Sequence, residues 1–377
     1  MEQRLLGVLL PSNREFGLDF LRAMAIIQVV LGHGVWDLIA VIPVELATMP
    51  LLNGGVTLFF VLSGFLIGRI LIRDFTDGEP GWHHLRRFWV RRWFRTLPNY
   101  FLVLAVLVAI AAVQQKLPED SWRYFFFLQN MMREHPNFYV EAWSLSIEEW
   151  FYLGFPLAFL LLGIIFGARR ELWLALAVAV LAGSIAIRYA YFLELDKLSL
   201  KAWDLNLRKN IVTRMDSLAL GVVAAWVSLY HATAWRRVRW PFLVIACGLY
   251  LGYNWSAADP VALLRAHPLY YSVFSFNVLS LAAALTLPAM SLWQRQQGVL
   301  FRWITLISLI SYSMYLLHYS LVRRVILESV SGLLPSMPTA LHHGLIYVSY
   351  WVLTVLLSVW LYRYFERPTT QLRERFG

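Results

Sequence analysis

The sequence predicts an all-α integral membrane protein, a bundle of about ten transmembrane helices with both termini in the cytoplasm. Hydrophobic residues make up 59% of its 377 residues and charged residues 15%, whereas soluble domains are about 45–50% apolar and 25% charged. The chain contains 17 Trp, 18 Tyr and 24 Phe, an abundance typical of aromatic belts at two membrane interfaces. The apolar residues also occur in separate runs, each close to the ~20 residues that a helix needs to cross a bilayer.

Ten apolar runs define the expected helices, and the third and seventh of them are short. They cover residues 17–36, 54–72, 98–114, 145–167, 172–190, 211–230, 241–255, 270–290, 304–323 and 342–362. The first run is not a cleavable signal peptide, because it lacks a small-residue cleavage site and carries charged groups. With a cytoplasmic N-terminus, most of the 33 Lys and Arg residues fall in cytoplasmic segments, as the positive-inside rule requires. We expect residues 1–377 to form a single transmembrane domain.

Charge and cysteine content exclude several other classes. The net charge of +10 does not indicate nucleic-acid binding, because the basic residues punctuate apolar runs as they do in membrane proteins. The single cysteine, Cys247, excludes a disulfide within the chain and a cysteine metal site. No H-E-x-x-H or similar spacing occurs, so we expect no metal ion.

The first apolar run carries three ionisable residues on one helical stripe. Arg22 and His33 are eleven residues apart, and at about 100° per residue both fall on nearly the same face. Asp19 precedes Arg22 by one turn and lies within about 40° of that face. Ionisable groups are costly in a bilayer, so the stripe is by default a functional-site hypothesis. We expect Arg22 near the inner face and His33 near the middle of the membrane.

A basic segment joins the second and third runs on the expected cytoplasmic side. It reads RRFWVRRWFRTLP, residues 86–98, and places Arg92 and Arg95 three residues apart on one side of a helix. Arginine forks bind phosphate oxygens, so this pair predicts a pyrophosphate or nucleotide site. The neighbouring arginines are interpreted as positive-inside charge in contact with anionic lipid of the bilayer.

Acidic residues lie near the expected outer ends of the fourth and sixth runs. Glu148 and Glu149 are adjacent in WSLSIEEWFY and point about 100° apart on a helix, so one of them is expected to face the interior. Arg214 and Asp216 in RMDSLALG could pair with one another or with the glutamates. Such a pair would either fix helix packing or contribute to the site.

The second and ninth runs are interpreted mainly in structural terms. Gly64 and Gly68 form a G-x-x-x-G pair, which lets helices approach closely. Ser63 beside them could line a cavity, but it lacks the G-x-S-x-G elbow of a hydrolase nucleophile. We expect His318, deep in the ninth run, to be a packed or hydrogen-bonded core residue.

Taken together, these motifs resemble the acyltransferase-3 family of integral membrane O-acyltransferases. The correspondence covers most of the chain: Arg22-x10-His33 after Asp19, FFVLSGFLI at 59–67, Arg92-x-x-Arg95 before Pro98, QN at 129–130, WSLSIEEWFY, RMDSLALG, SYSMYLLHYS and FERP at 365–368. Two departures are WFY for the commoner QFY and Tyr319-Ser320 for an aromatic-Pro pair. The expected relationship is to a stand-alone member without the extracytoplasmic SGNH hydrolase-like domain.

The resemblance implies transfer of an acyl group, usually acetyl, from coenzyme A to a hydroxyl of a carbohydrate or glycoconjugate. Acetyl-CoA would be a co-substrate, and no tightly bound cofactor is implied. The enzyme would lie in the bacterial cytoplasmic (inner) membrane. The identity of the acceptor and the need for a separate periplasmic partner stay open.

The resemblance also implies roles for the charged residues. His33 would be the general base or an acyl-carrying nucleophile, and Glu148 or Glu149 would orient the imidazole or bind the acceptor. Binding of the donor would fall to Arg22, Arg92 and Arg95, and support to Asp19, Ser63, Arg214 and Asp216. The alternative is a transporter or flippase of a glycan or lipid-linked sugar, although clear inverted repeats or broken helices are not evident.

Overall fold

The computed structural model describes residues 3–11, 14–42, 54–76, 81–194, 199–294, 298–332 and 337–376. Within these ranges, eight helices are long and apolar enough to cross a membrane. Their cores are α1 (Phe16–Ile39), α3 (Gly55–Thr76), α4 (Trp82–Val113), α5 (Ala142–Phe166), α6 (Arg170–Glu194), α12 (Ser275–Met290), α13 (Val299–Leu317) and α15 (Thr339–Leu361). The shorter helices α8 (Met215–Tyr230) and α10 (Arg239–Ser256) occupy the sixth and seventh predicted runs. The predicted all-α polytopic membrane architecture is confirmed.

Short elements connect these helices. They are η1 (Ser121–Phe126), α7 (Leu200–Ala202), η2 (Trp203–Arg208), α9 (Ala232–Arg237), α11 (Pro260–Ala266), η3 (Tyr270–Phe274) and α14 (Glu328–Ser331). A small antiparallel hairpin, β1 (Gln3–Leu5) and β2 (Val8–Leu10), precedes α1 and was not expected from the sequence. Leu6 and Gly7 between its strands both have positive φ, as a two-residue type I′ turn requires.

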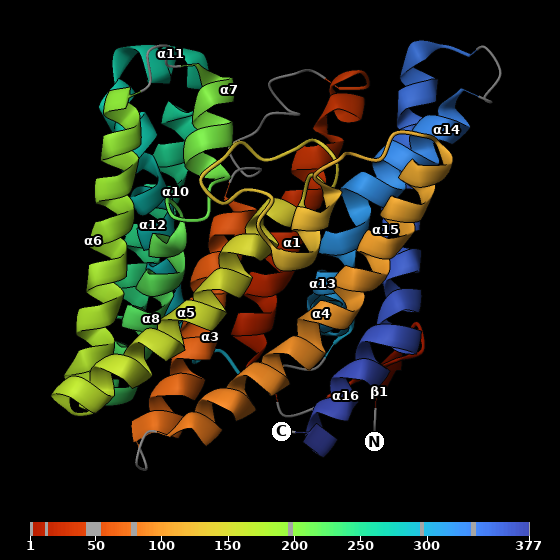
Figure 1. Cartoon of the computed structure of the whole chain (residues 1–377). Helices are drawn as coiled ribbons and strands as arrows, with labels where there is room; N and C mark the ends of the chain where they lie inside the picture. Colours follow the sequence, from red (N-terminus) through yellow and green to blue (C-terminus); the bar gives the residue numbers. More distant parts are fainter. Residues whose placement is uncertain are drawn as a thin grey trace.

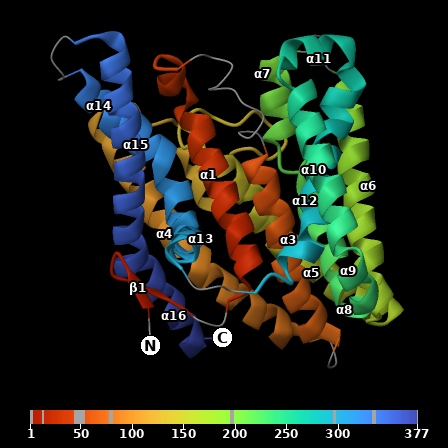
Figure 2. The same ribbon diagram turned by 180° about the vertical axis from the view of Figure 1, so that it is seen from behind.

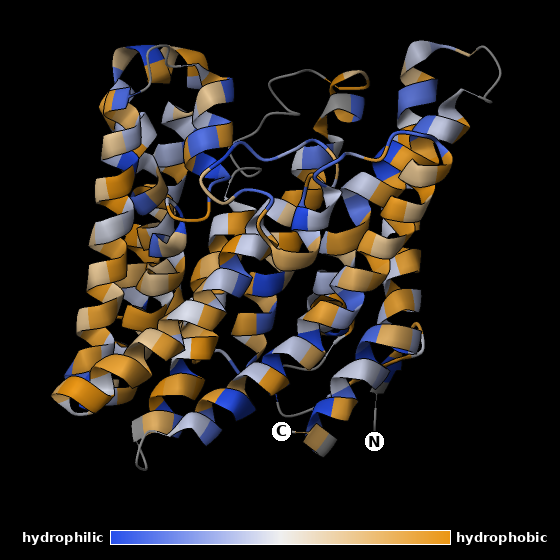
Figure 3. Cartoon of the chain, viewed as in Figure 1, coloured by the Kyte–Doolittle hydropathy of each residue, from blue (hydrophilic) through white to orange (hydrophobic). Residues whose placement is uncertain are grey.

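The two ends of the chain lie at the same end of the bundle. Figures 1 and 2 show β1 and α16 (Arg367–Phe376) together at one end, and α7, α11 and α14 at the opposite end. This placement agrees with the expectation that both termini lie on one side of the membrane. Apolar residues predominate along the outer helix α6 (Figure 3), where a lipid-facing surface requires them.

Close packing of α3 against α8 confirms the interpretation of the G-x-x-x-G pair. A Cβ atom on Gly64 would lie 2.0 Å from the carbonyl oxygen of Leu218, and one on Gly221 would lie 2.2 Å from that of Val61. The two backbones therefore touch, which a larger side chain at either glycine would prevent. This contact fixes the position of α3, which forms one wall of the cavity described below.

Three helices extend or change form beyond the predicted runs. Helix α4 begins at Trp82, so the basic segment is a continuous extension of the third span, with Pro98 inside the helix. Helix α13 continues as the π-helix η4 (His318–Leu327), and α15 continues through the π-helix η5 (Tyr362–Glu366) into α16. Hydropathy marks which residues can lie in lipid but does not mark where a helix leaves the bilayer and continues in water. The predicted start of α4 and the predicted ends of α13 and α15 were wrong for this reason.

Candidate functional site

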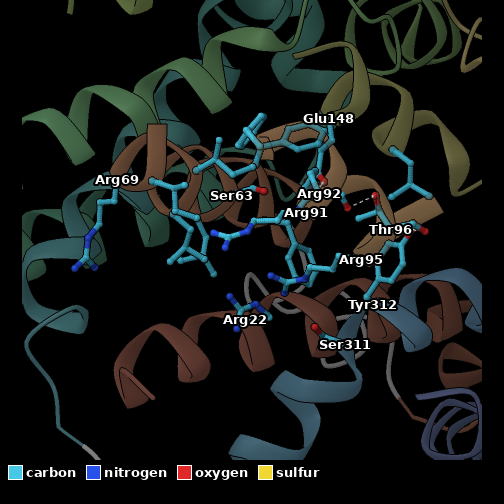
Figure 4. Close-up of a pocket in the computed structure, with 18 of the residues that line it drawn as sticks. Arg22, Ser63, Arg69, Arg91, Arg92, Arg95, Thr96, Glu148, Ser311 and Tyr312 are labelled. Atoms are coloured by element: carbon cyan, nitrogen blue, oxygen red, sulfur yellow. Dashed lines mark hydrogen bonds and ion pairs between the residues drawn. The ribbon is translucent and has the colours of Figure 1, made fainter. Parts of the chain in front are cut away.

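A cavity of about 790 Å³ opens among α1, α3, α4, α5, α13 and α16, within the about 300–1,000 Å³ usual for ligand sites. Its wall carries a large excess of positive charge. The arginines that line it are Arg14, Arg22, Arg69, Arg73, Arg91, Arg92, Arg95 and Arg373, and the acidic residues are Asp74, Glu148 and Glu374. Figure 4 shows Arg22 facing Arg91 and Arg95 across the cavity. Such a cluster of planar cations is suited to a ligand with several phosphate groups.

Asp19 holds Arg22 at the wall of this cavity. Its carboxylate accepts a hydrogen bond from Arg22 Nη1 at 3.1 Å and another from Ser308 Oγ at 2.8 Å. Arg14, from the segment before α1, pairs with the same carboxylate. The side chain of Asp19 is 3% exposed, so two cations neutralise one buried anion. Because Arg14 and Arg22 share the single charge of Asp19, the Arg22 guanidinium is held in position but keeps part of its positive charge uncompensated.

Arg92 is held from the opposite wall by Glu148. Arg92 Nη2 donates to Glu148 Oε2 at 3.2 Å, and Tyr152 OH donates to the same oxygen at 2.8 Å. The Arg92 guanidinium also stacks over the Tyr152 ring, 4.1 Å from its centroid, and Ser63 hydrogen-bonds to the Tyr152 hydroxyl. Ser63 thus lines the cavity, as the sequence suggested, and belongs to the support of Arg92.

The structure corrects the expected position of the two glutamates at the outer side. Glu148 lines the arginine-rich cavity, and Glu149 accepts a hydrogen bond from Thr96 Oγ1 on α4 at 3.0 Å. The residues from Ala142 to Ile147 are all buried, so α5 begins within the protein. Glu148 therefore lies roughly 9 Å inside the start of the helix. The apolar run alone does not reveal that depth.

Arg95 lines the same cavity without a close counter-charge. Among the described residues it makes no side-chain hydrogen bond or ion pair, although Glu366 acts on it electrostatically. Glu366, in the FERP segment, instead accepts hydrogen bonds from Asn99 Nδ2 at 3.0 Å and from Ser313 Oγ. That contact joins the C-terminal segment to α4 and α13. Arg95 is consequently a cavity arginine that can receive an anionic ligand without first breaking an ion pair of its own.

The expected pairing of Arg214 with Asp216 or with the glutamates was wrong. Asp216 pairs with Arg188 Nη1 of α6 at 2.8 Å, and both side chains are fully buried. Arg214 Nη2 donates to Thr57 Oγ1 of α3 at 3.0 Å. Arg188 lies within the fifth apolar run, residues 172–190, but the sequence analysis did not single it out. An ionisable residue in that run was the signal that could have revealed the buried pair.

His33 and His318 form a direct pair. His33 Nδ1 lies 2.6 Å from His318 Nε2, and the two rings meet edge to edge, with their centroids 4.9 Å apart and their planes 21° from parallel. His318 is fully buried, as expected for a core residue, but the sequence did not indicate that its partner is His33. His33 itself is partly exposed.

The histidine pair lies beyond the cavity wall. Tyr315 lines the cavity, and its ring centroid is 5.8 Å from that of His318. The Tyr315 hydroxyl is hydrogen-bonded to Ser144, another lining residue. His33 is not among the residues that line the cavity. Tyr315 therefore contacts the cavity on one side and His318 of the histidine pair on the other.

Glu141, which the sequence analysis did not single out, anchors the helix that carries His318. Its carboxylate accepts hydrogen bonds from the backbone N–H of Ser320 at 3.0 Å and from the Ser320 hydroxyl. Burial raises the pKa of the Glu141 carboxyl to about 7, against the opposing effect of these hydrogen bonds. The Ser320 N–H near the start of η4 thus bonds to Glu141, at the place where the α-helix α13 changes to a π-helix. Such π-helical turns are frequent at functional sites.

A second charged group lies near His33. Asp204 pairs with Lys209 Nζ at 2.6 Å and with Arg208, and all three charges act on His33 electrostatically. The Arg208 guanidinium lies 5.3 Å from the Trp143 ring centroid. Among the described residues, no group of three or more His, Cys, Asp or Glu side chains is arranged to hold a metal ion.

These features define a class: a multi-pass membrane protein with an arginine-lined cavity on the side of its termini and a histidine pair beyond it. A family model described as an acyltransferase domain matches residues 15–363. The chain belongs to this family, acyltransferase-3. The predicted family relationship is confirmed.

Three relatives illustrate the similarity. A putative O-acetyltransferase of Staphylococcus aureus (strain COL) is 32% identical over 158 residues, which are 37% of this chain and 24% of that protein. Peptidoglycan O-acetyltransferase OatA of Listeria monocytogenes is 31% identical over 163 residues, 38% of this chain and 24% of that protein. O-acetyltransferase OatA of Staphylococcus aureus (strain NCTC 8325 / PS 47) is 25% identical over 376 residues, 93% of this chain and 56% of that protein.

The chain thus matches about a quarter of the length of the first two relatives and about half of the length of the third. No solved structure matches it significantly.

Proposed function

We propose that the protein is a membrane O-acetyltransferase that uses cytoplasmic acetyl-CoA as donor and a carbohydrate or glycoconjugate hydroxyl as acceptor. The observation that carries the proposal is the arginine-lined cavity, which opens at the end of the bundle that also holds the termini. Coenzyme A carries a pyrophosphate and a 3′-phosphate, and the guanidinium groups of Arg22, Arg92 and Arg95 are complementary to them in charge. The three relatives are named as O-acetyltransferases, which supports O-acetyl transfer.

The donor would lie with its nucleotide among the arginines and its thioester directed past Tyr315 toward His33. His33 would then act on the acceptor hydroxyl as a general base, because an imidazole exchanges a proton readily near neutral pH. A covalent acyl-histidine intermediate is the alternative route at the same residue. The acceptor would approach from the side of Asp204, Arg208 and Trp143, where an aromatic ring and charged groups can contact a sugar.

Positive-inside charge supports a cytoplasmic position for the cavity, where acetyl-CoA is made. The matching relatives come from bacteria, which supports a bacterial cytoplasmic membrane. We also propose that a separate extracytoplasmic partner completes transfer to some acceptors.

The decisive assay gives purified protein in nanodiscs radiolabelled acetyl-CoA and a panel of carbohydrate acceptors. We expect labelled acceptor from the native protein and from His267→Ala, a matched control at an exposed histidine of the loop after α11, and none from His33→Ala. Unchanged label transfer by His33→Ala would remove the proposed role of His33. Acceptor movement into vesicles without acylation would instead support a transporter.

A single turnover without acceptor separates the two chemical routes. Label that stays on the protein and disappears in His33→Ala supports the acyl-histidine route. Label that stays entirely on coenzyme A until the acceptor is added supports the general-base route.

A further inference from the structure

The histidine pair carries an inference about which atom of His33 reacts. His318 Nδ1 lies 2.8 Å from the backbone oxygen of Tyr315 and 3.1 Å from that of Met314. A carbonyl oxygen can only accept a hydrogen bond, so His318 Nδ1 must carry a proton. A neutral imidazole has one N–H, and the Nε2 atom of His318 is therefore an acceptor.

This assignment determines the protonation of His33. His318 Nε2 accepts, so the 2.6 Å contact requires His33 Nδ1 to be the donor. With its single proton on Nδ1, neutral His33 has its lone pair on Nε2. Nε2 of His33 takes no part in the contact with His318, so it is the atom that can take a proton or attack an acyl carbon.

We propose that His318 is a positioning residue that fixes the tautomer and ring orientation of His33, and so makes His33 Nε2 the reactive atom. The inference rests on the proposed function. His318 is fully buried, edge to edge with His33 and tied to its own helix by the two carbonyl contacts. Its ring therefore cannot turn without losing buried hydrogen bonds, which is costly.

The assignment holds for both chemical routes. With His33 as base, Nε2 takes the acceptor proton while that oxygen attacks the thioester carbon; the C–S bond breaks, and the departing thiolate takes the proton from Nε2. With His33 as nucleophile, Nε2 forms the bond to the acyl carbon as the thiolate leaves. The acceptor oxygen later breaks that bond, and its proton neutralises the thiolate.

The pair also helps to hold the positive charge that His33 gains during the reaction. When Nε2 of His33 is protonated or acylated, its Nδ1–H becomes a charge-assisted donor to His318, which strengthens the hydrogen bond. The same logic applies to a catalytic triad, in which a third group orients the imidazole and selects its tautomer. Here a neutral histidine, and not a carboxylate, has that task.

The test uses nitrogen-15 NMR of the histidine-labelled full chain in nanodiscs, with the His33 signals assigned by their absence in His33→Gln. We expect His33 in the native protein to show a protonated Nδ1 and an unprotonated Nε2. A His33 signal with the proton on Nε2 would overturn the inference. Because this readout needs no activity, it separates a failure of the inference from a failure of the proposed acetyl transfer.

Kinetics supply a second readout. His318→Leu removes the acceptor, and we expect kcat to fall by about 100-fold, within the usual range for a positioned general base, while KM for acetyl-CoA changes less than about twofold. His318→Gln can offer an amide oxygen near the position of Nε2, and we expect it to recover most of the loss. Equal kcat in His318→Leu and the native protein would contradict the proposal. If His318→Leu does not fold, the NMR tautomer and the His318→Gln kinetics still decide it.

Discussion

The carboxylate of Glu148 lies 3.2 Å from the guanidinium of Arg92, and both line the same cavity. Their side chains are 15% and 14% exposed, so the pair meets the cavity while remaining largely out of bulk water. Glu148 therefore holds an arginine in place before any ligand arrives. A polyanionic donor would compete with Glu148 for Arg92, or share Arg92 with it.

Neutralising Glu148 should make the protein depend more strongly on an anionic ligand. We expect Glu148→Gln to lower the free energy of unfolding by about 2 kcal/mol, less than the ~3–5 kcal/mol of fully buried pairs because the cavity admits water. Coenzyme A should then raise the midpoint of thermal unfolding more in Glu148→Gln than in the native protein, since its phosphates replace the lost charge. Equal shifts in the two proteins would refute a shared anion site.

Arg95 should contribute mainly to donor affinity. A charge-assisted hydrogen bond to phosphate is worth about 1.5–3 kcal/mol, so we expect Arg95→Ala to raise KM for acetyl-CoA about tenfold with kcat nearly unchanged. Arg86→Ala, at an exposed arginine of the same helix that does not line the cavity, is the matched control and should leave KM unaltered. Steady-state kinetics at constant ionic strength measure both variants. Equal effects of the two substitutions would indicate general surface charge and not a specific contact.

Contact between α3 and α8 should tolerate no added methyl group. A Cβ at Gly64 would lie 2.0 Å from the Leu218 oxygen, so Gly64→Ala must separate the two backbones. We expect a loss of about 1–3 kcal/mol, typical of overpacking, seen as a lower unfolding midpoint in detergent. Gly183→Ala on α6, where no atom lies within 4 Å of the added Cβ, should have no such cost. A Gly64→Ala protein as stable as Gly183→Ala would show that the helices are less tightly packed.

Glu141 should make stability pH-dependent near neutrality. Burial raises the pKa of its carboxyl from 4.5 to about 7, so the folded protein retains this proton at a pH where the unfolded chain has lost it. The associated stabilisation is fully present below about pH 4.5 and is lost as pH rises through about 7, a difference of about 3 kcal/mol.

Glu141→Gln tests this prediction. The amide keeps an acceptor for the Ser320 N–H but cannot ionise. We therefore expect the unfolding midpoint of Glu141→Gln to fall less than that of the native protein as the pH rises from about 5 to about 8. Parallel pH profiles for the native protein and Glu141→Gln would show that another group is responsible.

Much of the molecule could be predicted because each helix and each motif depends on a short continuous stretch of sequence. The apolar runs located the helices, since crossing a bilayer imposes a length and an apolar composition. Gly64 and Gly68 predicted a close helix contact, because small residues four positions apart let two helix backbones approach. Arg92 and Arg95 were predicted to bind phosphate from their type and spacing, and Arg22 was added by the family resemblance. The structure brings all three to one cavity.

The sequence by itself thus determined the fold class, the family, the approximate positions of the membrane-spanning segments and the side of the membrane on which positive charge collects. The tertiary structure decided the partners: Glu148 with Arg92, Asp216 with Arg188, Glu141 with Ser320 and His33 with His318. These partners are separated by up to 285 residues in the chain. Helical periodicity gives the face on which a side chain lies, but not the neighbour that the face meets. In a bundle, that neighbour follows from how the helices cross, and crossing depends on contacts throughout the molecule.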